Sequence, residues 1–185
     1  MATPSHILTC SLWLPRSIED VFAFFGNAHN LEELTPGFLG FRILTPPPIL
    51  MAPGTLIDYR ISLRGVPIRW RTRIAAWEPP FRFIDEQLQG PYSLWHHEHV
   101  FERDQGGTRC ADRVSYRSRG GPLVHRLMVA PELLKIFRFR QAALLARMTG
   151  AAGPGHEIEP PTIGPPTIGP PTIGRVQNEG SPPRG

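Results

Sequence analysis

Apolar and polar residues alternate along most of the first 118 positions. In the first of these stretches, Leu8, Cys10, Leu12 and Leu14 share one side. Such alternation is typical of strands that bury one face. It predicts seven strands, at residues 6–14, 38–44, 54–63, 68–77, 81–89, 92–103 and 108–118. The links between successive strands after the helical region are short, so neighbours in the sequence are expected to pair antiparallel.

Helical spacing occurs in the remaining parts. Ser17 is suited to cap the start of a helix that ends at Gly26, and a second short helix is expected over residues 28–34. Residues 123–149 place apolar side chains at helical spacing, with an interruption expected at Pro131. The pattern therefore predicts an α+β fold. A curved, seven-stranded antiparallel sheet wraps around the long C-terminal helix, and two short helices follow the first strand.

The last part of the chain has a different composition. Residues 160–174 are three consecutive copies of Pro-Pro-Thr-Ile-Gly. Segments rich in proline and glycine bury too little surface to offset the entropy lost on ordering. We therefore predict a folded domain over residues 1–150 and a disordered tail over residues 151–185. A polyproline-type segment that docks on a partner is the alternative for the tail.

Several function classes are not expected from this sequence. It has no apolar run long enough to span a membrane, and its first residues lack the pattern of a secretory signal. We therefore expect a cytoplasmic protein, in which Cys10 and Cys110 are buried, reduced thiols. These two cysteines are too few for a disulfide framework.

Charge gathers on the outer side of the predicted sheet. The net charge is +4, and Lys135 is the only lysine among the basic residues. Glu86, Glu98 and Glu102 are expected to pair with part of an outward arginine set, and contact with an anionic membrane surface or an acidic partner is the alternative. Exposed aromatic residues are not interleaved with these arginines, so nucleic acid is not expected as a partner. The outward arginines are Arg60, Arg64, Arg69, Arg71, Arg73, Arg109, Arg113 and Arg117.

The last predicted hairpin turns polar residues toward the core. His97 and His99 share a face with Trp95 and Phe101, and Asp112 shares the apolar face of the next strand. A turn centred on residues 104–105 places His97 opposite Asp112, whereas a turn centred on residues 105–106 places His99 there. Slips of a single residue would place inner residues against outer ones. In either register, one inward histidine is the cross-strand partner of Asp112.

Three interpretations of these residues stay open. The histidine–aspartate pair can complete the wall, hold the polar end of a ligand, or act in acid–base catalysis or metal binding. His-x-His on a strand brings two imidazoles together, but no third ligand beyond Asp112 is convincing, so we predict no metal and no cofactor. His97, His99 and Asp112 are the catalytic candidates. Asp85 and Gln87 are further polar candidates in a strand whose inward face is ambiguous.

Large aromatic residues on the inward faces favour an internal cavity over a solid core. Their size, the polar atoms of tyrosine and tryptophan, and their common face with histidine and aspartate are typical of small-molecule pockets. The predicted ligand-binding residues are Tyr59, Trp70, Phe83, Trp95, His97, His99, Phe101, Asp112, Tyr116 and Phe137.

Several stretches resemble the START and birch-pollen-allergen-like helix-grip superfamily, also called SRPBCC or polyketide cyclase/dehydrase-like. The most specific stretch covers residues 85–116, with Asp85-x-Gln87-x-x-Gly90-Pro91, Trp95-x-His97-x-His99-x-Phe101, Gly107-Thr108 and Asp112-x-Val114-x-Tyr116. Within the superfamily, the chain is most similar to a bacterial ligand-binding subgroup of undefined function.

The resemblance implies a deep hydrophobic cavity between the sheet and the long helix. It implies binding or carriage of a small apolar ligand, such as a lipid, an isoprenoid or quinone, or an aromatic polyketide. An acid–base cyclase or dehydratase acting in the same cavity is the alternative, because this fold does not decide function.

Overall fold

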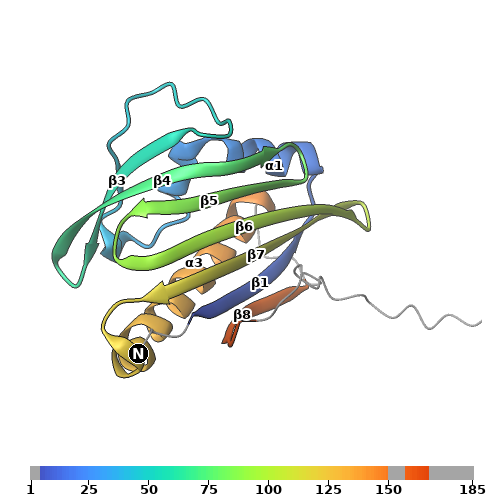
Figure 1. Ribbon diagram of the computed structural model, residues 1–185. Coiled ribbons are helices and arrows are strands. Elements are labelled where there is room, and N and C mark those ends of the chain that lie inside the picture. The colour runs from blue at the N-terminus through green and yellow to red at the C-terminus, as the bar shows by residue number, and fades with distance from the viewer. Residues whose placement is uncertain (1–4, 150–156, 167–185) are drawn as a thin grey trace, which may run out of the picture.

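Eight strands form one antiparallel sheet that curves around a long helix (Figure 1). The computed structural model describes residues 5–149 and 157–166. The strands lie in the order β2-β3-β4-β5-β6-β7-β1-β8. Their bounds are β1 His6–Leu14, β2 Arg42–Ile43, β3 Leu56–Leu63, β4 Val66–Glu78, β5 Arg82–Gln89, β6 Tyr92–Asp104, β7 Gly107–Ser118 and β8 Ile158–Gly164. Six of the seven predicted strands have nearly their predicted bounds, and β8 is an additional strand.

The connection between β1 and β3 is less regular than the sequence predicts. Helix α1 (Ile18–Gly26) begins as expected, because the Ser17 side chain accepts a hydrogen bond from the backbone N–H of Asp20. The second predicted helix is only a 3-10 turn, η1 (Ala28–Leu31). The strand predicted over residues 38–44 is wrong except for β2, because a second 3-10 turn, η2 (Gly37–Leu39), occupies its start. This turn ends at Gly40, whose φ of 50° belongs to the left-handed region.

The C-terminal helix continues past its proline. It comprises α2 (Gly121–Val124), a turn of π-helix, η3 (His125–Val129), and α3 (Ala130–Thr149). Pro131 lacks a backbone N–H, and its ring crowds the carbonyl four residues earlier. The wider π turn lies directly before this position, so the predicted interruption takes the form of a π turn rather than a break. None of the described helices is long and apolar enough to cross a membrane.

The β6–β7 hairpin adopts the second of the two predicted registers. Its two loop residues, Gln105 and Gly106, have φ angles of 47° and 79°. Two consecutive residues with positive φ form the turn that best matches the twist of paired strands. As a result, His99 lies opposite Asp112 and Phe101 lies opposite Cys110.

Disorder was predicted for the whole tail, but one part of it is a strand. Residues 158–164, which include the first Pro-Pro-Thr-Ile-Gly copy, form β8 against β1. Composition indicates only how much surface a segment can bury by itself. Here the segment is stabilised by pairing with β1, which would otherwise be a free edge of the sheet. Proline is tolerated on an edge strand, where its missing N–H faces away from the sheet. The second and third copies lie largely outside the described residues.

Polar contacts attach β8 to the domain. The Gln141 side-chain amide on α3 donates to the backbone oxygens of Ser11 and Glu159, at 3.0 and 2.8 Å. The Ser11 hydroxyl donates to the Glu159 carboxylate at 2.8 Å. Arg109, which the sequence placed on the exposed outer face, is buried because Glu157 lies over it and pairs with it at 2.5 Å.

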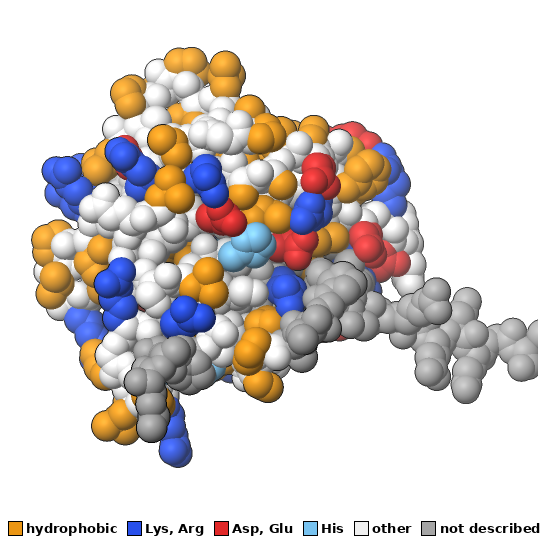
Figure 2. All heavy atoms as spheres, in the orientation of Figure 1, with side chains coloured by type: hydrophobic (Ala, Val, Ile, Leu, Met, Phe, Trp, Pro, Cys, Tyr) orange, Lys and Arg blue, Asp and Glu red, His pale blue; other side chains and the backbone are white. Residues whose placement is uncertain are grey.

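The outer face of the sheet mixes basic and acidic side chains, which lie next to one another in Figure 2. Glu86 pairs with Arg73 of the predicted arginine set, whereas Glu98 pairs with Arg82, which is not in that set. Three cross-strand pairs on this face are Arg71–Asp58, Arg73–Glu86 and Arg82–Glu98, each at 2.7 Å. Exposed pairs of this kind contribute only about 0–1 kcal/mol each. Contact of this face with an anionic membrane remains a prediction.

Candidate functional site

A cavity of about 180 Å³ lies between the inner face of the sheet and α3. Residues of β3 to β6 form one wall, and α1, the 3-10 turns and α3 form the other. Seven of the ten predicted ligand-binding residues line it. They are Tyr59, Trp70, Phe83, Trp95, His97, His99 and Phe137.

The other three predicted ligand-binding residues are not part of the lining. Phe101 packs edge-on against Phe22 of α1, with ring centroids 5.4 Å apart, in a second apolar cluster. Tyr116 is fully buried, and its hydroxyl hydrogen-bonds His125 Nε2 at 2.9 Å. Asp112 lies behind the two histidines of β6. All three face inward, as alternation predicts, but an inward residue reaches the cavity only where nothing packs over it.

The aromatic wall is held in place by one threonine. The rings of Tyr59 and Trp70 stack at 5.7 Å, and Trp95 meets Trp70 edge-on at 5.3 Å. Thr72 hydrogen-bonds the Tyr59 hydroxyl at 3.0 Å and accepts from Trp70 Nε1 at 3.1 Å. The polar atoms of both rings are therefore satisfied within the wall, which leaves mainly apolar ring surface for a ligand.

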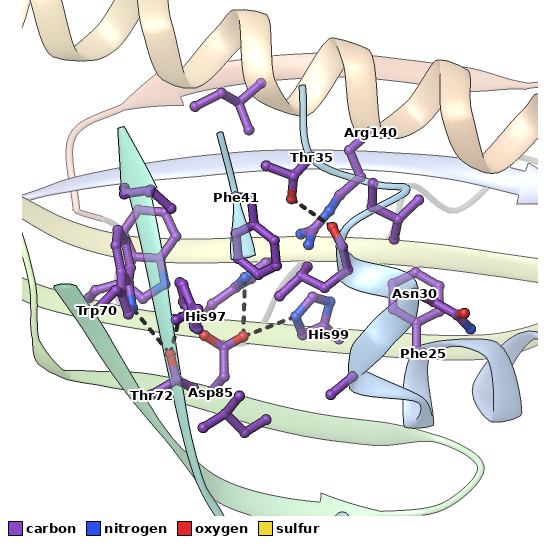
Figure 3. Close-up of a pocket in the computed structure, with 18 of the residues that line it drawn as sticks. Phe25, Asn30, Thr35, Phe41, Trp70, Thr72, Asp85, His97, His99 and Arg140 are labelled. Atoms are coloured by element: carbon purple, nitrogen blue, oxygen red, sulfur yellow. Dashed lines mark hydrogen bonds and ion pairs between the residues drawn. The ribbon is translucent and has the colours of Figure 1, made fainter. Parts of the chain in front are cut away.

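Two histidines and two aspartates form one cluster on β5, β6 and β7, of which Figure 3 shows Asp85, His97 and His99. His97 Nε2 is hydrogen-bonded to Asp112 Oδ1 at 3.0 Å, and His99 Nε2 is hydrogen-bonded to Asp85 Oδ2 at 3.2 Å. The second nitrogen of each ring also lies near a carboxylate. His97 Nδ1 is 3.3 Å from Asp85 Oδ2, and His99 Nδ1 is 2.7 Å from Asp112 Oδ1. Each histidine thus contacts both aspartates.

Contacts within the cluster favour the ionised forms of His97, Asp85 and Asp112. Burial alone would lower the pKa of His97, but the charge of Asp85 and the hydrogen bonds to Asp112 and Asp85 raise it overall. Burial likewise opposes ionisation of the two aspartates. The pKa of Asp112 is nevertheless well below its usual range because of His99 and His97, and His97 and His99 lower the pKa of Asp85 in the same way.

Apolar rings and one thiol surround the cluster. Phe83 stacks on His99 with ring centroids 4.0 Å apart, and Phe137 lies 5.6 Å from His97. The Cys10 thiol donates to Asp112 Oδ2 at 3.8 Å. Burial raises the pKa of this thiol, so it is a neutral donor behind the wall. Both Cys10 and Cys110 are buried and free, as predicted.

Asp85 and Gln87, whose orientation the sequence left open, have different roles. Asp85 lines the cavity together with His97 and His99. Gln87 lies near the end of β5, where its side chain donates to the backbone oxygen of Tyr92 at 2.7 Å and accepts from the Tyr92 N–H at 3.2 Å. Gln87 therefore closes the β5–β6 turn and is not part of the cavity lining.

Arg140 is a cavity residue that the sequence analysis did not identify as a site residue. It extends from α3 into the space beside His99 and Phe41 (Figure 3). Its guanidinium lies 5.6 Å from the centre of the Phe137 ring. Among the described residues, no carboxylate lies within ion-pair distance of it. A partly buried cation without an acidic partner is suited to an anionic group of a ligand.

Comparisons with known proteins support the fold. No protein-family model and no curated protein matches the sequence. Among solved structures, Ara h 8.0201 is 18% identical and superposes with a TM-score of 0.51 over 76% of this chain and 98% of its own. Major latex-like protein 151 from Panax ginseng is 9% identical, with a TM-score of 0.56 over 78% of this chain and 97% of its own.

A third similar structure is a nucleoside-diphosphate sugar epimerase from Corynebacterium glutamicum, at 25% identity and a TM-score of 0.58. The match covers 76% of this chain but only 29% of that protein. The chain has the helix-grip fold of the birch-pollen-allergen type. At these identities the likeness to Ara h 8.0201 and the ginseng protein establishes the fold alone. The bacterial subgroup expected from the sequence remains a prediction.

Proposed function

We propose that this helix-grip protein binds or carries one small ligand in the cavity, and that the apolar part of this ligand is about the size of a single ring. The cavity volume carries the proposal. Pockets for drug-sized ligands enclose roughly 300–1,000 Å³, whereas a dry apolar cavity of about 150 Å³ binds benzene. At about 180 Å³, this cavity is close to the second case.

We further propose that the ligand carries an acidic group. Arg140 supports this, because its guanidinium reaches the cavity and has no carboxylate of the described residues within ion-pair distance. Aromatic rings of Tyr59, Trp70 and Trp95 would contact the apolar part, and the acid would lie at Arg140. The ligand class is therefore a small aromatic or alicyclic acid rather than a long-chain lipid.

Calorimetric titration with benzoate tests the proposal, with benzamide as an uncharged ligand of the same shape. We expect one site per chain and a dissociation constant below about 1 mM for benzoate. Ala28 lines the cavity and is buried, so Ala28→Leu fills part of the space and should weaken binding at least tenfold. Ala142→Leu adds the same volume at an exposed position of α3 and should leave binding unchanged.

A second pair of variants tests the acidic group. Arg140→Leu should weaken benzoate binding about 10- to 100-fold and benzamide binding much less, because only benzoate loses a charged partner. Arg138→Leu removes an exposed arginine from the same helix and should change neither. Equal losses for both ligands in Arg140→Leu would contradict an acidic ligand. Absence of any ring-compound binding to the wild type would contradict the function itself.

Acid–base catalysis is the second candidate function. It is favoured by one observation, that a carboxylate and two imidazoles, those of Asp85, His97 and His99, line the cavity where they can exchange protons with a ligand. A cyclase or dehydratase of this kind would need His97 or His99 for turnover of its substrate. Full turnover by His97→Gln and His99→Gln variants on an identified substrate would exclude this candidate and leave the binder.

A further inference from the structure

The histidine–aspartate cluster brings three metal-ligating atoms together. Asp85 Oδ2 lies 3.3 Å from His97 Nδ1 and 3.2 Å from His99 Nε2, and the three side chains offer donor atoms within 4.8 Å of one another. Nitrogen and oxygen ligands lie about 2.1 Å from zinc, so neighbouring ligands in tetrahedral or octahedral geometry are roughly 3.0–3.4 Å apart. The distances from Asp85 to both histidines fit this spacing.

Asp112 has the position of a supporting carboxylate. Its Oδ1 lies 3.0 Å from His97 Nε2 and 2.7 Å from His99 Nδ1. These are the ring nitrogens that do not face Asp85. In metal sites, a ligating histidine commonly directs its other ring nitrogen to a carboxylate, which fixes the orientation of the ring. One oxygen of Asp112 can serve both rings in this way. Asp112 itself is not part of the cavity lining.

The charge of the cluster also suits a divalent cation. With neutral imidazoles, Asp85 and Asp112 leave two negative charges in a mostly buried site. Buried charges are stable only when they are paired. One divalent ion between Asp85, His97 and His99 would pair with both charges.

The site opens toward the ligand space. Asp85, His97 and His99 all line the cavity, so an ion bound between them would keep at least one coordination position on the cavity side (Figure 3). Two histidines and one carboxylate with open positions are a donor set used by zinc and ferrous ions. No metal is predicted from the sequence, because Asp112 is the only third donor that the strand pattern places near the two histidines. The structure instead places Asp85 beside both histidines.

We propose that Asp85, His97 and His99 bind one divalent first-row transition-metal ion, and that Asp112 positions the two imidazoles. The inference goes beyond the proposed function, because it depends on no ligand in the cavity. It also requires no redox step. The ion would place a Lewis acid at the apolar ligand space.

Metal titration of the full chain tests this inference. The protein is first dialysed against a chelator and then titrated with Zn²⁺ by calorimetry and with Co²⁺ by visible absorption, without any organic ligand. We expect one ion per chain, and Co²⁺ bands whose intensity reports the coordination geometry. Asp85→Asn removes the shared carboxylate and should weaken Zn²⁺ binding at least 100-fold. Asp112→Asn should weaken it about 10- to 100-fold.

A neighbouring histidine supplies the matched control. His96 directly precedes the proposed ligand His97 but pairs with Glu86 on the outer face, so His96→Gln should bind Zn²⁺ as the wild type does. His97→Gln is the second ligand variant in case Asp85→Asn does not fold, as judged by circular dichroism. Failure of the wild type to bind either ion stoichiometrically would overturn the inference. Unchanged binding in the folded Asp85→Asn or His97→Gln variant would also overturn it.

Discussion

At the scale of single residues, three members of the histidine–aspartate cluster could be predicted from the sequence and the fourth, Asp85, could not. His97, His99 and Asp112 were recognisable because alternation in their strands is clear. Asp85 was ambiguous because Phe83 and Ile84 are consecutive and both buried, at 5% and 7% exposure, so apolar character does not distinguish the two faces of β5. Arg140 gave no signal because other arginines of α3 have the same sequence environment. Its access to the cavity depends on how the helix is rotated against the sheet.

The raised pKa of His97 predicts a pH dependence of stability in the metal-free protein. A histidine whose pKa is higher in the folded than in the unfolded state stabilises the fold below its ordinary pKa near 6.5. This stabilisation is lost as the pH rises through the folded-state pKa. The difference in free energy of unfolding between wild type and His97→Gln should therefore be larger near pH 5.5 than near pH 9, about one unit or more on either side of 6.5.

Urea unfolding of both proteins after chelator dialysis measures this difference. Burial lowers the pKa of His6 and of His125, but both residues are present in the two proteins, so their contributions cancel. Asp85 and Asp112 have lowered pKa values and stay ionised over this range. A difference that is constant with pH, or that grows toward pH 9, would contradict the proposed ion pairing of His97.

At the scale of elements, β8 shows where composition misled the sequence analysis. The tail is poor in apolar residues and rich in proline, and by itself it would bury little. However, β1 would end the sheet with unpaired backbone groups if β8 were absent, and edges of this kind readily accept another strand. Pro161 is buried and Ile163 packs against the main core, although both belong to a repeat that looks unstructured. Pairing with a distant strand is not visible in local sequence.

Removal of β8 should destabilise the domain. A chain that ends at residue 156 loses the hydrogen bonds of Glu159 with Ser11 and Gln141, and Arg109 loses Glu157. Hydrogen bonds contribute about 1 kcal/mol each, and those to charged groups about 1.5–3 kcal/mol. Because Glu157 and Glu159 are exposed, the lower values apply, and we expect a loss of about 4 kcal/mol. Urea unfolding measures it. A chain that ends at residue 166 keeps β8 and should match the full chain, and equal stability of the two truncated chains would contradict the role of β8.

At the scale of the whole molecule, most of the architecture was predictable, but the dimensions of the cavity were not. Alternation gave the strands and their inward faces, and short links gave the antiparallel order. The register of the last hairpin stayed open because both turns use the same polar and glycine residues. The cavity volume depends on the separation between α3 and the sheet, which arises from many side chains together. For this reason Phe101 and Tyr116 were assigned to the ligand although they belong to the packed interior.

The central claim is that a single ring with an acidic group occupies the cavity beside the histidine–aspartate cluster. The most direct measurement is a crystal structure of the protein with 4-bromobenzoate, in which anomalous scattering locates the bromine. We predict one bromine position inside the cavity, with the carboxylate at the Arg140 guanidinium. Bromine sites only on the surface, or a cavity in which Arg140 contacts no ligand, would contradict the account.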